Sequence, residues 1–120
     1  FTWLNRGQQS VALAIKADED REILLNMLDT ADVFIQNLLP GALTKLGLDS
    51  ATLREKFPRL VTCDITGYGE DGPMRSAKAY DLLVQCESGL ASVTGTPDGP
   101  DRVGVSVCGI ATGMTTHAEI

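Results

Sequence analysis

The chain has 120 residues, enough for one domain with a hydrophobic core, and its 43% hydrophobic and 22% charged residues are ordinary for a globular protein. A formal net charge of −6 argues against a nucleic-acid surface, which needs a basic stripe, but not against a small phosphate-bearing ligand. No run approaches the roughly 20 apolar residues of a membrane span. A single histidine, His117, and no paired cysteines argue against a metal site.

In the first half of the chain, short apolar runs alternate with a helical pattern. Residues 10–15 (SVALAI) are typical of a buried strand, and the acidic residues at 18–20 favour the start of a helix. Residues 32–36 (DVFIQ) predict a second strand, and residues 42–46 a short helix that Gly47 ends. The expected apolar face of the first helix consists of Ile23, Leu24, Met27, Leu28 and Ala31.

The second half continues the alternation. A helix beginning at 49 or 50 should end at Pro58, and residues 59–65 (RLVTCDI) predict a third strand. A glycine-rich loop at 67–73, a helix at 80–88 and a turn cluster at 94–100 follow. Residues 103–114 (VGVSVCGIATGM) read as a last strand with valines at 103, 105 and 107, running into a helix that begins near Gly109.

This alternation predicts an α/β fold, a Rossmann-like open parallel sheet with helices on both faces. In such sheets ligands bind outside the carboxyl ends of the strands. Neither GxGxxG after the first strand nor GxxxxGK[ST] is present, so both standard phosphate fingerprints are missing. The glycine-rich loop is either a mobile surface loop or a loop that closes over a ligand.

Five polar residues at expected strand ends or near helix starts are candidates for ligand contacts, each with an ordinary alternative. Lys16, Lys45 and Lys78 could meet phosphate or be solvated surface lysines. Asn37 could face a ligand or cap the residues that follow it. Asp81 could work in acid–base chemistry or serve as a helix cap.

The three cysteines, Cys63, Cys86 and Cys108, are scattered among apolar residues. This pattern indicates buried free thiols in a reducing cytoplasm. Cys108, beside the last strand-to-helix junction, is kept as a candidate nucleophile.

Five segments in order resemble the family III CoA-transferases, which include formyl-CoA transferase and carnitine CoA-transferase, with α-methylacyl-CoA racemase as a relative. The segments are NRGQQSVALAIK, ADVFIQNLLPGALTKLGL, PRLVTCDITGYGEDGP, AYDLLVQCESGLASVTG and VGVSVCGIATGM. The resemblance implies that residues 1–120 are part of the large CoA-binding domain of a cytoplasmic protein. It also implies that the smaller second domain lies outside this chain, and that the full protein is an interlocked homodimer.

The resemblance further implies which residues meet coenzyme A or its acyl thioester. The nucleotide end would be met by the segment Leu13, Ala14, Ile15 and Lys16. The family's Asn-Phe-Arg/Gly is matched by Asn37, Leu38 and Leu39, with Leu38 in place of the usual aromatic residue. A CoA phosphate would be reached by Lys45, and the pantetheine and thioester region would be lined by Lys78, Ala79, Tyr80 and Asp81.

In the family, an aspartate after the last strand attacks the acyl-CoA thioester, and an aspartyl-CoA thioester follows before the acceptor acid takes the CoA. Counting back from Gly113, the position of that aspartate is occupied by Gly109. Glycine has no carboxylate, so we expect this chain to bind acyl-CoA and a carboxylic acid without normal turnover.

Three other interpretations stay open. The chain could be a non-catalytic CoA-binding or scaffolding subunit whose partner supplies the carboxylate. It could be a relative of the racemases, although Tyr80 stands where their histidine would be. It could also be a plain nucleotide-binding α/β domain.

Overall fold

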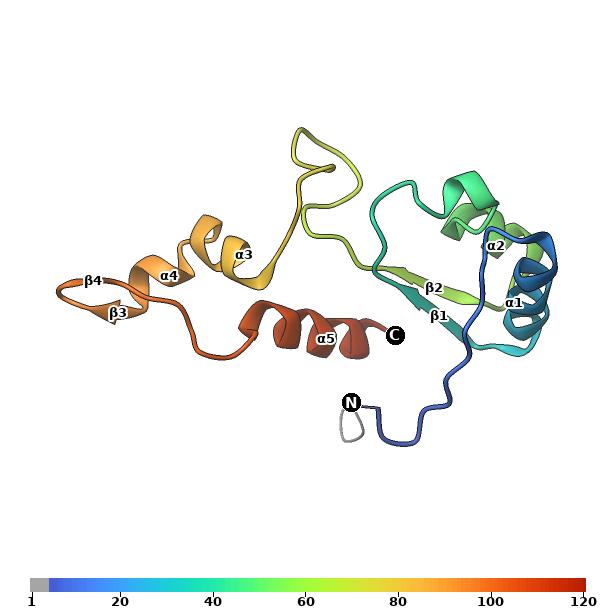
Figure 1. Cartoon of the computed structure of the whole chain (residues 1–120), viewed down its shortest axis with the longest axis horizontal. Coiled ribbons are helices and arrows are strands. Elements are labelled where there is room, and N and C mark those ends of the chain that lie inside the picture. Colours follow the sequence, from blue (N-terminus) through green and yellow to red (C-terminus); the bar gives the residue numbers. More distant parts are fainter. Residues whose placement is uncertain (1–4) are drawn as a thin grey trace.

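A computed structural model describes residues 5–120, which form a mixed α/β arrangement with a small parallel sheet (Figure 1). The elements in chain order are α1 (Asp18–Thr30), β1 (Val33–Gln36), a 3-10 helix (Thr44–Leu46), α2 (Ser50–Lys56), β2 (Val61–Asp64), α3 (Asp81–Glu87), α4 (Leu90–Val93), β3 (Gly95–Thr96), β4 (Gly99–Pro100) and α5 (Val107–Glu119). Among the described residues, no helix is both long and apolar enough to cross a membrane.

The two predicted strands at 32–36 and 59–65 are confirmed as β1 and β2, which pair in parallel. Val33 lies opposite Val61 and Gln36 lies opposite Asp64, so both strands end at the same edge of the sheet. The 3-10 helix and α2 form the crossover between them. At the start of α2, the Asp49 side chain accepts a hydrogen bond from the Thr52 amide at 3.1 Å, which caps the helix.

The buried core lies on one side of this sheet, between α1, α2 and the crossover. It consists of Leu28, Leu43, Leu48, Leu53 and Leu60. Phe34 packs against this core, whereas the next residue, Ile35, points to the other face and is 51% exposed. On α1, the expected apolar face is partly wrong, because Ile23 and Met27 are exposed while Leu25 packs against the core.

Two predicted strands do not form in the described chain. Residues 10–15 pair with no strand. Of their apolar side chains, only that of Ile15 packs against the core. Residues 103–106 are loop, and α5 begins at Val107, two residues earlier than expected. In this loop the Val103 amide donates to the Gln85 side chain at 2.8 Å and the Val107 amide to the Val105 carbonyl at 2.8 Å. These partners replace a strand ladder.

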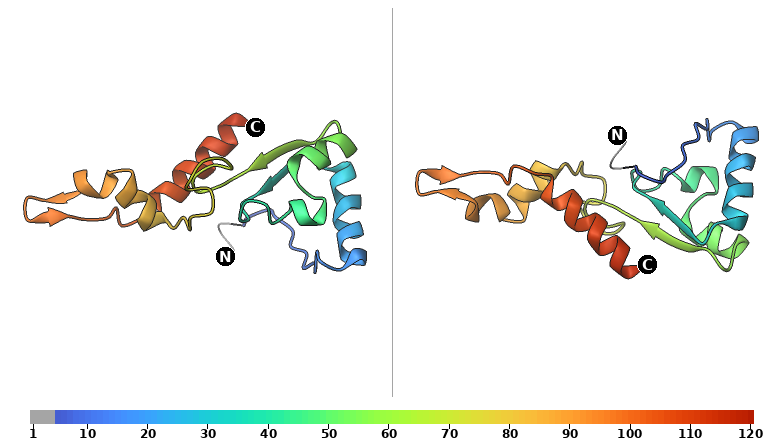
Figure 2. Two further views of the ribbon diagram at one scale, coloured as in Figure 1. Left: turned by 90° about the horizontal axis from the view of Figure 1, so that it is seen from above. Right: turned by 90° about the horizontal axis from the view of Figure 1, so that it is seen from below.

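The chain is elongated, with its core at one end. Its radius of gyration is 17.5 Å, whereas a compact domain of this length has roughly 14 Å. The turn cluster forms the β3–β4 hairpin, which lies at the opposite end of the molecule from α1 in both views of Figure 2. Between these ends, α3 packs on α5. The second half of the chain therefore contributes little to the leucine core.

Candidate functional site

A hollow of about 420 Å³ lies where the carboxyl ends of β1 and β2 meet the first turns of α3 and α5. It brings together three of the segments that the sequence singled out: Asn37, the stretch from Ala79 to Asp81, and Gly109. The other lining residues are Ile65, Thr66, Gly67, Val84, Ser106, Cys108, Thr112 and Gly113. Asn37 and Ile65 follow paired strand ends, so parallel pairing places them at one edge.

Hydrogen bonds to the side chains of Asp64 and Gln36 hold these strand ends. The Asp64 carboxylate accepts from the Gln36 amide at 2.8 Å and from the Ser50 hydroxyl at 2.5 Å. The side-chain carbonyl oxygen of Gln36 accepts from the backbone amide of Leu38 at 2.6 Å. This network links both strands to the start of α2 and fixes the backbone on either side of Asn37.

Gly67 allows the loop after β2 to touch the segment before α3. A Cβ atom built on Gly67 would lie 2.1 Å from the Ala79 Cβ, far closer than two nonbonded carbons approach. Glycine at 67 is therefore what lets the end of β2 and the start of α3 line the same hollow.

Gly109 is the third residue of α5, in its first turn. A Cβ built there would meet only the Ser106 Cβ, at 4.0 Å, so the position has room for a side chain. The amides of Cys108 and Gly109 both donate to one oxygen of Asp81, Oδ1, at 2.9 and 3.1 Å. The N-terminus of α5 is thus capped by a residue of α3.

The other Asp81 oxygen, Oδ2, accepts from the Gln85 side-chain amide at 2.6 Å. Gln85 is wholly buried, and its carbonyl oxygen accepts from the Val103 amide. The hydrogen bond from Gln85, followed by those from the two α5 amides, lowers the pKa of Asp81 below its ordinary value, so the carboxylate is ionised at neutral pH.

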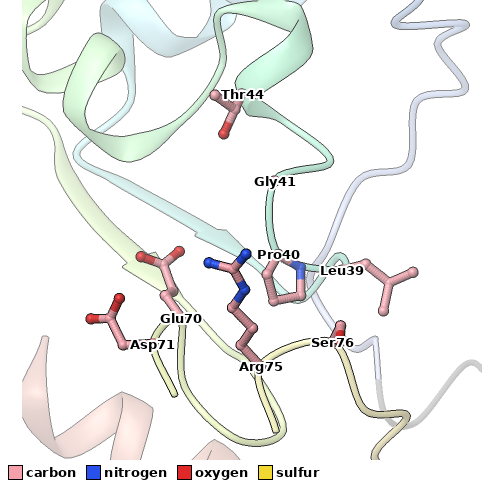
Figure 3. Close-up of a pocket in the computed structure, with 8 residues that line it drawn as sticks. All are labelled: Leu39, Pro40, Gly41, Thr44, Glu70, Asp71, Arg75 and Ser76. Atoms are coloured by element: carbon pink, nitrogen blue, oxygen red, sulfur yellow. The ribbon is translucent and has the colours of Figure 1, made fainter. Parts of the chain in front are cut away.

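A second hollow, of about 600 Å³, lies between the segment after β1 and the loop at 70–76 (Figure 3). Its lining residues are Leu39, Pro40, Gly41, Thr44, Glu70, Asp71, Arg75 and Ser76. In Figure 3 the Arg75 side chain extends from the loop toward Pro40, with Glu70 beside it. The glycine-rich loop thus contributes to both hollows, through Gly67 to the first and through Glu70 and Asp71 to the second.

Comparison with known proteins decides the family. The model of CoA-transferase family III matches residues 1–120. This chain belongs to CoA-transferase family III. A succinate–glutarate CoA-transferase of Agrobacterium fabrum is 42% identical over 97% of this chain and 29% of its own length. An acetyl-CoA:oxalate CoA-transferase of Acetobacter aceti is 42% identical over 87% of this chain and 27% of its own length.

A solved structure of a hypothetical protein from Mycobacterium tuberculosis superposes on this family III chain with a TM-score of 0.84 at 34% identity, covering 92% of this chain and 32% of the other. The chain spans under a third of the length of each of these relatives. The described residues are therefore a partial domain, which accords with the position of the core at one end.

The residues that the resemblance assigned to CoA are not all brought together in the family III chain. Leu39 lines the second hollow. Ile15 packs against the leucine core, and the Ala14 amide donates to Asp20 at 2.6 Å. Seven of the assigned residues line neither hollow, and their contact with CoA stays a prediction: Leu13, Ala14, Ile15, Lys16, Leu38, Lys45 and Lys78.

The cysteines of the family III chain correct one expectation. All three are free, but none is buried, and Cys86 is exposed. Cys108 lines the first hollow and its side chain is partly exposed. Residues 5–120 contain no group of three or more His, Cys, Asp and Glu placed to hold a metal ion.

Sequence reasoning missed Gln85, which bonds to Asp81 beside the first hollow, and Arg75, which lines the second. Gln85 lies four residues after Asp81, a helical spacing that brings the two side chains together and was available as a signal. Arg75 ends the stretch GYGEDGPMR, and its position in the sequence gives no indication that it lines the second hollow.

Proposed function

We propose that the protein containing this chain binds acyl-CoA thioesters and belongs functionally with enzymes that move CoA between an acyl thioester and a carboxylic acid. The observation that carries the proposal is the first hollow, which gathers Asn37, Tyr80 and Gly109 at the carboxyl edge of the sheet. Membership of family III and the transfer reactions in the names of two relatives support the same reading.

The chemistry needs a carboxylate at position 109. An aspartate there would attack the thioester carbonyl, forming a mixed anhydride and releasing CoA thiolate. The thiolate would then attack the aspartyl carbonyl, giving an aspartyl-CoA thioester and the free donor acid. Attack by the acceptor acid and return of the thiolate to the acceptor acyl group would complete the exchange and regenerate the aspartate.

In this chain none of these bonds can form at residue 109, because glycine carries no carboxylate. We therefore propose that the site binds CoA thioesters but does not turn them over by the aspartyl route. The neighbouring Cys108 does not replace the carboxylate in this proposal, because a thiol cannot form the anhydride.

The test uses the full-length protein and its Gly109→Asp variant. CoA transfer from several acyl-CoA donors to succinate, glutarate and oxalate would be followed by chromatography. Mass spectrometry would search for an acyl or CoA adduct on residue 109. Gly109→Asn is the matched control, because it fills the same space with a similar side chain that cannot act as the nucleophile.

We expect transfer and an adduct only in Gly109→Asp. An adduct on another residue of the unaltered protein would overturn the claim that Gly109 prevents transfer. A Gly109→Asp protein that binds CoA but transfers nothing would overturn the assignment of position 109.

A second candidate is a CoA-binding or scaffolding subunit whose partner supplies the carboxylate. It is favoured by the same glycine, which leaves open space where a partner's side chain could enter. Calorimetric titration with acyl-CoA, CoA and ADP separates the candidates. Binding that needs only the ADP part indicates a plain nucleotide site, and transfer that needs an added partner chain indicates the scaffold.

The resemblance supports two further proposals, a homodimer of the full-length protein and a cytoplasmic location. Sedimentation analysis of the full-length protein tests the first, and a monomer at working concentration would overturn it. Cell fractionation tests the second, and recovery outside the cytoplasm would contradict it. A racemase activity is not proposed, because Tyr80 and Gly109 occupy the positions of its proton-transfer pair.

A further inference from the structure

The first turn of α5 depends on α3 for its hydrogen bonds. The first four amides of a helix have no partner inside the helix. Ser106, at the N-cap of α5, makes no side-chain cap, and the amides of Cys108 and Gly109 instead donate to Asp81 Oδ1. A helix that is capped by a neighbouring helix is held in place relative to that neighbour, not merely stabilised.

Gln85 extends this connection to the loop that leads into α5. Its side-chain amide donates to Asp81 Oδ2, and its carbonyl oxygen accepts from the Val103 amide, 2.8 Å away. Gln85 itself is wholly buried, and both of its bonds are partly buried. The chain is thus attached to α3 at Val103 and again at residues 108 and 109, so the backbone that leads to residue 109 is held at two places.

We propose that the Asp81–Gln85 pair is a positioning device that sets where the side chain of residue 109 meets the hollow. This inference rests on the proposed function, because it assigns importance to position 109. It also changes the role of Asp81 from a CoA contact to a positioning residue. Both carboxylate oxygens of Asp81 are bonded to groups of α3 and α5, while the neighbouring Tyr80 is 64% exposed and lines the hollow.

The direction of each hydrogen bond gives a sharp test. In Asp81→Asn, an NH₂ group replaces the oxygen that faces the Gln85 amide, and turning Gln85 around would place its NH₂ against the Val103 amide. In Gln85→Glu, two carboxylates face each other. In the double variant Asp81→Asn/Gln85→Glu, the new asparagine donates to the new glutamate, whose second oxygen accepts from the Val103 amide. All four hydrogen bonds then form again, with the total charge unchanged.

The variants would be made in the full-length Gly109→Asp protein. Misplacing a reacting group by about 1 Å costs on the order of 100-fold in rate. We therefore expect each single variant to lower kcat by about 10- to 100-fold. We expect the Kd for acyl-CoA to stay within about two-fold, and the double variant to recover most of the lost kcat. Gln85→Ala, which removes both bonds without a charge conflict, should resemble the singles.

Three results would overturn the proposal. They are a single variant as active as its parent, a folded double variant no better than the worse single, and a single variant that weakens acyl-CoA binding with kcat unchanged. The last result would return Asp81 to the CoA contacts.

A second readout does not need activity. Hydrogen exchange at the amides of residues 108 and 109 should be faster in each single variant and slow again in the double, also in the unaltered Gly109 protein. If Gly109→Asp is inactive but the exchange pattern holds, the proposed function fails and the Asp81–Gln85 connection stands. If exchange is unchanged in both single variants, the connection itself is refuted.

Discussion

The close approach of Gly67 and Ala79 predicts that a methyl group added at residue 67 destabilises the protein. In Gly67→Ala the new Cβ would lie 2.1 Å from the Ala79 Cβ. Nonbonded carbons sit about 3.5–4.0 Å apart, so the two segments must separate by roughly 1.4 Å or more. Overpacking of this kind costs about 1–3 kcal/mol, and we expect Gly67→Ala to lower the free energy of unfolding by that amount.

The matched control is Gly104→Ala. A Cβ on Gly104 meets nothing within 4 Å, and Gly104 is not among the glycines with positive φ. Replacing glycine by alanine also restricts the unfolded chain, which stabilises by about 0.4–1 kcal/mol, and the control measures that effect without a clash. The difference between the two variants therefore reports the contact with Ala79 alone.

The assay is urea unfolding of the full-length protein, with acyl-CoA binding measured beside it. The double variant Gly67→Ala/Ala79→Gly moves the methyl group from one segment to the other. It should recover most of the loss, because the next nearest atom, the Ala79 Cα, is 3.5 Å from the added Cβ. If Gly67→Ala proved as stable as Gly104→Ala, the close approach of the two segments would be wrong.

Three further predictions concern the core, a helix cap and acid sensitivity. Leu53→Ala, at a fully buried position, should lower the free energy of unfolding measured in urea by about 2–5 kcal/mol. Leu83→Ala, at a position 44% exposed, should lower it clearly less. Equal losses would contradict the assigned core. Asp49→Ala should lower the melting temperature and Asp49→Asn much less, because asparagine also caps; equal effects would argue against capping. The lowered pKa of Asp81 means that its stabilising effect is present above the unfolded pKa near 3.8 and is lost as pH falls through the folded value. Melting temperatures between pH 5 and pH 2 should therefore fall more steeply in the unaltered protein than in Asp81→Asn, and parallel curves would refute this linkage.

Local patterns in the sequence were sufficient to predict the elements of residues 18–64, the part of the chain that holds the leucine core. The acidic first turn of α1, the apolar runs of β1 and β2 and the cap of α2 at Asp49 each act over a few residues, and the structure confirms the elements they predicted. The edge where Asn37 lies could also be predicted, because parallel strands end together. The same reasoning does not cover Tyr80 and Gly109, because no strand of the parallel sheet directly precedes them; they reach the first hollow at the starts of α3 and α5.

The failures have a common physical cause. An apolar run indicates burial or pairing only if a partner is present, and residues 10–15 and 103–107 have the composition of strands without the ladder. For the second run, the competing partners are side chains of α3, which take the amides of Val103, Cys108 and Gly109. The periodicity of apolar residues along the chain does not indicate whether these amides bond to a neighbouring strand or to side chains of α3.

The sequence by itself determined the elements from α1 to β2, because each depends on residues close together in the chain. Motifs that recur in order along the chain gave the family and the prediction that Gly109 stands in the place of a carboxylate. Only the tertiary structure decided that Gly67 touches Ala79 and that Asp81 caps α5 from 27 and 28 residues away. These contacts join segments that are distant in sequence, and they form only once the chain has brought those segments together.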